Sequence, residues 1–215
     1  MTFTHLKSPI SFKYAINGTN LQSLVNSVTD LGFVLCPTLS PNLYIGHVCC
    51  KSLKILCFIK RITTEFKLAS PLKALYCSLV RPILEYGSVI WDLNTAQNVI
   101  MLERVQNKFL KYISHVLKIE CPPHNYLPVI KYLKLDSLAD RRRANNLKFL
   151  SKLLTGQIDS PHLLSLIPLN VPPRSTRQHT TFSLPTSSTN YGLNEPLRRC
   201  MSIANSDLSF SISYI

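Results

Sequence analysis

Glycine and acidic residues are scarce in this sequence, and each shortage excludes a class of protein. The 215 residues include 6 Gly against 14 Pro, and neither GxGxxG nor GxxxxGK[ST] occurs, so a glycine-rich phosphate loop is not expected. Asp and Glu number 11 against 24 Lys and Arg, which gives a formal net charge of +13. Charged residues make up only 16% of the chain and apolar types 46%. This composition indicates a protein with a hydrophobic core rather than a disordered basic arm.

The sequence also lacks signals for export or membrane insertion. The sequence has seven cysteines, and most of them lie inside apolar runs. An odd number of cysteines without a secretory leader is typical of reduced thiols. The N-terminal segment has no basic start, apolar stretch and cleavage site of a signal peptide. The most apolar window, residues 43–59, contains Lys51 and Lys54, and each would cost about 2.5–3.5 kcal/mol at a bilayer centre. We therefore expect an intracellular protein, cytoplasmic or nuclear, that is not secreted and has no membrane partner.

The hydrophobic pattern divides the chain into three regions. Residues 1–41 alternate in the manner of strands around Asn17-Gly18, which predicts a small antiparallel β-hairpin. Residues 42–167 carry helical periodicity. Residues 168–215 are rich in Pro, Ser and Thr, which predicts an extended or disordered tail. The predicted fold class is mainly α, a helical bundle with a small N-terminal hairpin and an extended C-terminal tail.

Four helices are expected in the central region, over residues 42–66, from Ser70, over 95–117, and from Ser137 to near Gly156. Pro82 lies inside the second helix and has no amide donor, so a kink or two abutting helices is expected there. Ser137-x-x-Asp140 predicts a cap at the start of the last helix.

The helix expected over residues 95–117 has one cationic face. With 100° per residue, its apolar residues fall on the opposite side, and Glu103 lies outside the basic stripe. A solvated helix face usually mixes charges of both signs, so this pattern favours phosphate binding over a merely solvated surface, which stays open as an alternative. The residues on the cationic face are Arg104, Lys108, Lys111, His115 and Lys118.

The helix from Ser137 repeats this pattern more weakly. Arg141, Lys148 and Lys152 share one side of it, and Arg142 and Arg143 are expected to extend the cationic surface. Two basic helices suit a nucleic-acid backbone, because each neutralised phosphate releases condensed counterions without any reading of sequence. The candidate nucleic-acid-binding residues are Arg104, Lys108, Lys111, Lys118, Arg141, Lys148 and Lys152.

Patterns for metal binding and catalysis are poor. Cys121-x-x-His124 has half of a zinc spacing, but no second pair follows at a suitable distance. Neither GxSxG nor HExxH occurs. Asp136 and Asp140 lie at a helix start, where a cap is the better interpretation than a catalytic pair. The sequence therefore predicts no catalytic residue, no metal ligand and no cofactor in this chain.

Residues 72–114, LKALYCSLVRPILEYGSVIWDLNTAQNVIMLERVQNKFLKYIS, closely resemble the segment after the catalytic palm in reverse transcriptases of non-LTR retrotransposons, in their jockey-like branch. The family pattern LY-x-x-LVRPxLEYxxxxW, followed by LExVQxxFxR/K, is matched from Leu75 to Lys111. Further matches at residues 14–47 and 138–198 extend the resemblance over nearly the whole chain.

The resemblance implies the nucleic-acid-gripping part of an RNA-directed DNA polymerase. The full-length enzymes use divalent metal held by palm aspartates, whereas no two aspartates are adjacent in this sequence, so we expect the chain to be inactive alone. Residues 1–41 would adjoin the missing palm and residues 42–167 would form the thumb and connection. A thumb grips an RNA–DNA hybrid by its phosphates and its shape. The expected partners are such a hybrid or other nucleic acid, and the palm or a protein that covers the exposed apolar face.

Two other hypotheses remain open. The chain could be a host-retained helical module whose apolar surface binds a protein partner. It could also be a non-functional retroelement remnant, which would fit Cys36 and Pro41, where the family pattern has Asp and an aromatic residue.

Overall fold

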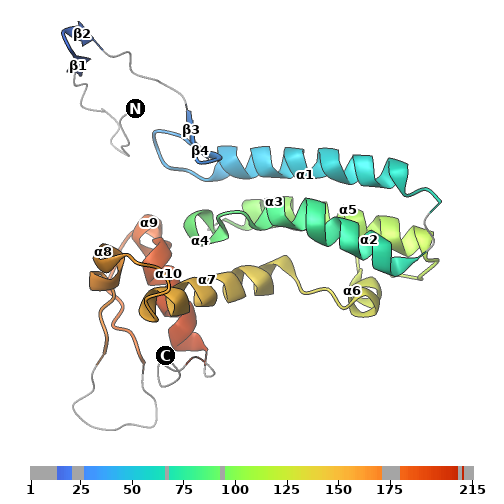
Figure 1. Cartoon of the computed structure of the whole chain (residues 1–215). Helices are drawn as coiled ribbons and strands as arrows, with labels where there is room; N and C mark the ends of the chain where they lie inside the picture. Colours follow the sequence, from blue (N-terminus) through green and yellow to red (C-terminus); the bar gives the residue numbers. More distant parts are fainter. Residues whose placement is uncertain are drawn as a thin grey trace.

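The computed structural model describes residues 14–20, 27–65, 68–92, 95–170, 180–207 and 210. Within them the chain is mainly helical, with small antiparallel hairpins at the N-terminal end (Figure 1). The predicted fold class is thereby confirmed. The long helices are α1 (Asn42–Ile62), α5 (Ala96–Val116) and α7 (Leu138–Leu154).

Two hairpins precede α1, and the first of them turns at Asn17-Gly18, as the sequence predicts. In the first, β1 (Ala15–Ile16) pairs with β2 (Thr19–Asn20). In the second, β3 (Val28–Asp30) pairs with β4 (Phe33–Leu35). The turn residues of both have positive φ, as two-residue hairpin turns require. Of the β region expected over residues 1–41, residues 1–13 and 21–26 lie outside the described residues.

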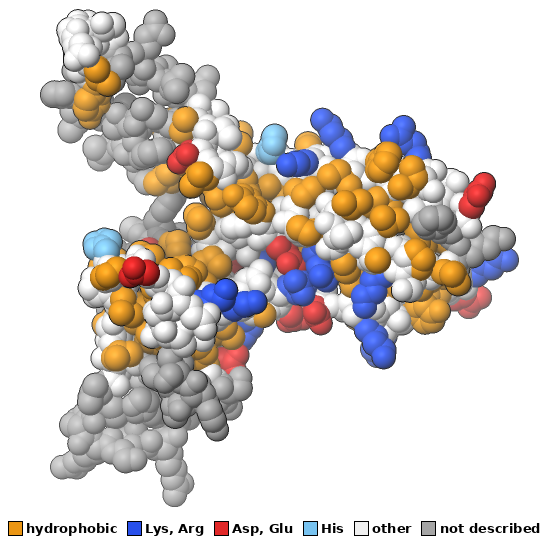
Figure 2. Space-filling model, viewed as in Figure 1, with side chains coloured by type: hydrophobic (Ala, Val, Ile, Leu, Met, Phe, Trp, Pro, Cys, Tyr) orange, Lys and Arg blue, Asp and Glu red, His pale blue; other side chains and the backbone are white. Residues whose placement is uncertain are grey.

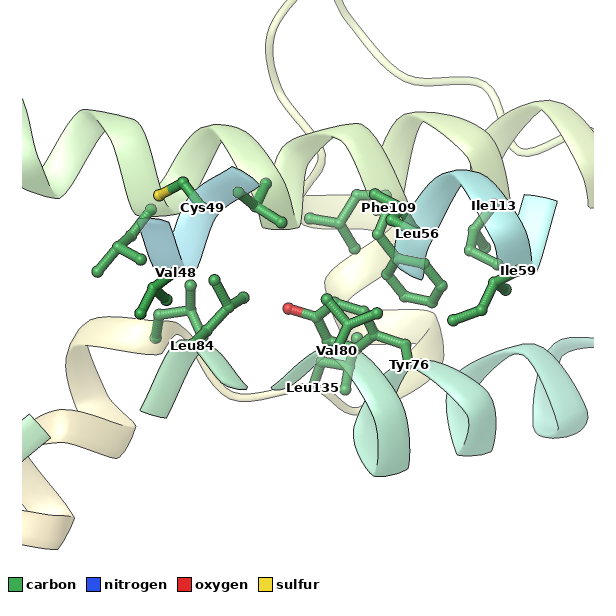
Figure 3. Close-up of a cluster of buried hydrophobic side chains, with 14 of the residues drawn as sticks. Val48, Cys49, Leu56, Ile59, Tyr76, Val80, Leu84, Phe109, Ile113 and Leu135 are labelled. Carbon is green, nitrogen blue, oxygen red and sulfur yellow. The ribbon is translucent and has the colours of Figure 1, made fainter. Parts of the chain in front are cut away.

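The first hydrophobic core lies between α1, α5 and the chain segment that joins them. That segment runs through α2 (Ala69–Leu75), the π-helical η1 (Tyr76–Val80) and α3 (Arg81–Glu85). Side chains from α1, η1, α3 and α5 converge in Figure 3. The Tyr76 ring stacks on Phe109 with centroids 4.1 Å apart, and its hydroxyl donates to Gln106 Oε1 at 3.3 Å. These contacts fix α5 against η1.

The irregularity expected at Pro82 is present as a π-helical turn. Pro82 stands in the first turn of α3, directly after η1, and has no N–H to donate. The preceding five residues, Tyr76–Val80, take up the change of register as the π-helix η1. The helix predicted from Ser70 is therefore two abutting helices joined by η1.

A second core forms where the C-terminal part of the chain meets α7. α10 (Pro196–Ser206) packs across α7, as Figure 1 shows. Four of its apolar residues, Leu197, Cys200, Met201 and Ala204, are buried. The short helices α4 (Ser88–Trp91), α8 (Pro161–Ser165) and α9 (Asn190–Leu193) complete this part. The buried residues of the second core are Leu150, Leu153, Ile167, Phe182, Leu197, Cys200, Met201 and Ala204.

The helix α10 differs from the extended tail that the composition suggests. Glu195 caps it by accepting from the Arg198 amide at 3.3 Å, and Pro196 stands in its first turn. Leu197, Cys200, Met201 and Ala204 then recur on one helix face. This short apolar stripe is sufficient to hold α10 as a packed helix, because α7 supplies the other half of the core.

Among the described helices, α1 is long and apolar enough to cross a membrane by length and composition alone. One of its faces is buried against α5 and α3. This is the arrangement of a core helix, although its outer face also carries apolar side chains, among them Leu43 and Phe58.

Candidate nucleic-acid interface

The cationic face of α5 is held outward by the burial of the opposite face. Thr95 caps the helix by accepting from the Asn98 amide at 3.4 Å. The Asn98 side chain in turn donates to Asn42 Oδ1 at 2.8 Å, which ties α5 to the start of α1. The buried residues of α5 are Asn98, Leu102, Val105, Gln106, Phe109, Leu110 and Ile113.

Arg104, Lys108 and Lys111 are exposed on the outer face of α5, as the sequence pattern predicts. In the part of the chain that the structure describes, none of these three side chains forms an ion pair with a carboxylate. Their charge is therefore not neutralised within the described fold. We refer to Arg104, Lys108 and Lys111 as the α5 stripe.

The α5 stripe borders a shallow groove of about 490 Å³. Its opposite wall is formed by the loop before α6 (Leu127–Leu133), through His124 and Tyr126. The other lining residues lie on α5 itself and are Val99, Ile100, Glu103 and Asn107.

Lys60, near the end of α1, joins the same cationic surface. Its ammonium group lies 5.5 Å from the centroid of the Tyr112 ring on α5. Burial lowers the pKa of Lys60, and the nearby Lys108 and Lys111 lower it further. Sequence reasoning missed Lys60, because no spacing within α1 distinguishes it from the other basic residues of that helix; only the packing of α1 on α5 brings it there.

Glu103 is a carboxylate in the wall of this groove. Burial raises the pKa of Glu103 above its ordinary value, against the opposing effect of Arg142. A half-buried carboxylate here weakens the attraction of the groove for an anion.

Arg141 is engaged in an ion pair rather than free for phosphate. It binds Glu85 through two nitrogens, with Nη2 to Oε2 at 2.9 Å and a second, closer contact from Nε to Oε1. A further carboxylate, Asp136, lies 3.6 Å away. Hydrogen bonding to Glu85 raises the pKa of Arg141. Arg141 thus anchors the start of α7 to α3, which the sequence pattern could not reveal.

Lys148 and Lys152 are exposed on α7 and line a different, smaller groove of about 260 Å³. Lys118, exposed just past the end of α5, lines neither groove. The structure therefore brings together Arg104, Lys108 and Lys111, and does not join them with the α7 lysines in one groove.

The expectation that Arg142 and Arg143 extend the cationic surface is wrong for Arg142. Its side chain is 7% exposed and its Nε lies 3.4 Å from Asp92 Oδ1. Arg199 of α10 approaches Asp92 Oδ2, also at 3.4 Å. Arg143 lies 3.5 Å from Asp207. These arginines bind carboxylates brought close by α4 and α10, so their charges stabilise the fold.

No group of three or more His, Cys, Asp or Glu side chains that could hold a metal ion occurs among the described residues. Cys121 and His124, the half zinc spacing, gain no third ligand there.

Comparisons of the chain with protein-family models, curated proteins and solved structures found no match.

Proposed function

We propose that this chain binds the phosphate backbone of nucleic acid, as the thumb-like, non-catalytic part of a retrotransposon reverse transcriptase, with an RNA–DNA hybrid as its ligand. The observation that carries the proposal is the α5 stripe. Three exposed cations, about one turn apart along one helix face, have no carboxylate partner among the described residues and are joined by Lys60. The resemblance of residues 72–114 to the post-palm segment supports the choice of ligand.

Binding of this kind gains most of its free energy from counterion release. If about four to six phosphates are contacted, log K should fall with log salt at a slope of roughly −3.6 to −5.4. The affinity should be similar for hybrids of different sequence, because phosphate contacts carry no base information.

The test is a salt titration of hybrid binding by the full chain and by the triple variant Arg104→Gln, Lys108→Gln, Lys111→Gln. Up to three phosphate contacts are removed, so the slope should become shallower by about 2 to 3. The apolar face of α5 is untouched, and circular dichroism should show the helix content of the wild type.

A matched control removes three exposed cations from the outer face of α1, by Lys51→Gln, Lys54→Gln and Arg61→Gln. Its net charge equals that of the α5 variant. A slope unchanged by the α5 substitutions, or reduced equally by both sets, would contradict the assignment of the ligand to α5.

The same preparation should not extend a primer. The sequence has no adjacent aspartate pair, and the cations of α5 cannot replace carboxylates that hold divalent metal at the growing end. Incorporation above background on a primed RNA template, with Mg²⁺ or Mn²⁺, would overturn this part of the proposal.

The second candidate is a helical module that binds a protein partner. Figure 2 shows hydrophobic side chains gathered over α1, α2 and α3. The exposed apolar residues of the chain include Phe58 of α1 at 48% and Leu79 of η1 at 41%. Exposed apolar side chains in proximity are typical of a surface that another protein covers. If hybrid binding by the full chain does not depend on the α5 stripe, this second function is favoured.

A further inference from the structure

The loop that faces the α5 stripe is rigidly built. Pro122 and Pro123 restrict its backbone, and the Asn125 amide donates to the Pro122 carbonyl at 3.1 Å. Asn125 Oδ1 then accepts from the Leu127 amide at 3.0 Å, at the first residue of α6. The Tyr126 carbonyl accepts the first α6 bond, from Ile130, at 3.0 Å. The backbone on both sides of Tyr126 is therefore fixed before any ligand binds.

Tyr126 itself is half-buried. Part of its side chain packs against the first core, and part of it lines the groove beside His124. An aromatic side chain held in this way loses little conformational entropy when a ligand ring stacks on it. Across the groove, Val99 and Ile100 offer an apolar surface, and Ile100 is 58% exposed.

The groove thus combines two chemistries at close range. The α5 stripe attracts phosphate, and the rings of Tyr126 and His124 offer flat surfaces to an aromatic group. In a duplex the bases are stacked on each other and only their edges are accessible. A base of a single strand has both faces free, and single-strand-binding proteins combine a cationic groove with aromatic side chains on which such bases stack.

We propose that this groove binds a nucleotide of a single-stranded segment, with its phosphate on the α5 stripe and its base on Tyr126. The inference rests on the proposed function, because the same cations hold the backbone of the adjoining hybrid. It adds a preference for a hybrid that carries a single-stranded extension over a blunt hybrid.

The test compares three ligands for the full chain: a blunt RNA–DNA hybrid, the same hybrid with a single-stranded extension, and the same hybrid with an extension of abasic nucleotides. The base-bearing extension should tighten binding about fivefold or more over the blunt hybrid, the gain expected for at least one stacked base. The abasic extension keeps every phosphate, so it should give only the smaller electrostatic part of that gain.

Tyr126→Leu should remove the advantage of the base-bearing over the abasic extension and leave the affinity for blunt hybrid unchanged. Leucine retains apolar contacts with the core, and Tyr126→Phe should retain the advantage. Tyr132→Leu is the control, since Tyr132 is 62% exposed on α6 and does not line the groove. Thermal unfolding of each variant establishes that the fold is retained.

The outcomes separate the two proposals. If blunt hybrid binds with the expected salt slope but bases in the extension add nothing, or their gain survives Tyr126→Leu, the nucleotide site is overturned and the proposed function stands. If hybrid binding does not depend on the α5 stripe, both are overturned.

Discussion

Gly87 is a position where a side chain would clash with an aromatic ring. It follows α3 with φ of +62°, and a Cβ at this position would lie 2.1 Å from Phe33 Cζ. The Phe33 ring in turn packs between Tyr44 and Tyr86, at centroid distances of 5.0 and 5.3 Å. Glycine here therefore allows the β3–β4 hairpin to dock on the helices.

Gly87→Ala should destabilise the protein by about 2–4 kcal/mol, the sum of left-handed backbone strain and overpacking against an aromatic ring. Chemical denaturation measures this. Gly46→Ala is the control, because a Cβ at Gly46 in α1 meets nothing within 4 Å; it should stabilise by up to about 1 kcal/mol. Equal effects of the two substitutions would mean that Phe33 does not occupy this position.

Removing the charge of Glu103 should strengthen hybrid binding, whereas removing the cations of the α5 stripe should weaken it. Glu103→Gln removes the carboxylate from the groove beside the α5 stripe, so hybrid affinity should rise about two- to fivefold at low salt and less at high salt. Fluorescence anisotropy at two salt concentrations measures the change. Weaker binding would show that the carboxylate contacts the ligand favourably, for example through a base amino group.

At the scale of elements, the sequence is most informative where the determinants are local. The turn at Asn17-Gly18, the Ser137 cap and the two faces of α5 depend on residues a few positions apart, and all are found as predicted. Burial of Arg142 and docking of α10 depend on contacts between distant parts of the chain, which spacing does not encode. The same reason explains Lys60, whose place beside α5 follows from helix packing.

The cap of α7 is a testable element. Ser137 Oγ accepts from the Asp140 amide at 3.0 Å and donates to Asp140 Oδ2 at 2.6 Å. Ser137→Ala should cost about 1 kcal/mol and Ser137→Gly only a few tenths, as measured by urea unfolding. No loss in the alanine variant would mean that other contacts determine where α7 begins.

For the whole molecule, Asp92 connects parts of the chain that are distant in sequence. Its carboxylate lies beside Arg142 of α7 and Arg199 of α10, and accepts from the Asn146 side chain at 2.9 Å. Asp92 follows α4, so one carboxylate holds α4, α7 and α10 together. The pKa of Arg199 is lowered by burial, against the opposing effect of Asp92.

Asp92→Asn should therefore destabilise the protein by about 3–5 kcal/mol, because two almost buried arginines lose their counter-charge. Asp136→Asn is the matched control. Its carboxylate is 69% exposed and lies 3.6 Å from Arg141, so its loss should cost no more than about 1 kcal/mol. Thermal or urea unfolding of both variants decides this, and similar losses would contradict the role of Asp92 as the link between the helices.

Stability should also differ along the chain. The four strand residues of β1 and β2 are exposed, and this hairpin lies apart from the helices in Figure 1; a two-stranded hairpin alone is marginally stable. The β3–β4 hairpin is held to α1 by Phe33 on Tyr44, and Tyr86 donates to the Leu31 carbonyl at 2.8 Å. Native-state hydrogen exchange should therefore be fastest at residues 15–20, intermediate at 28–35 and slowest in the buried turns of α5. Protection of residues 15–20 equal to that of α5 would mean that the first hairpin is covered, and protection that rises with protein concentration would identify a second copy of the chain as the cover.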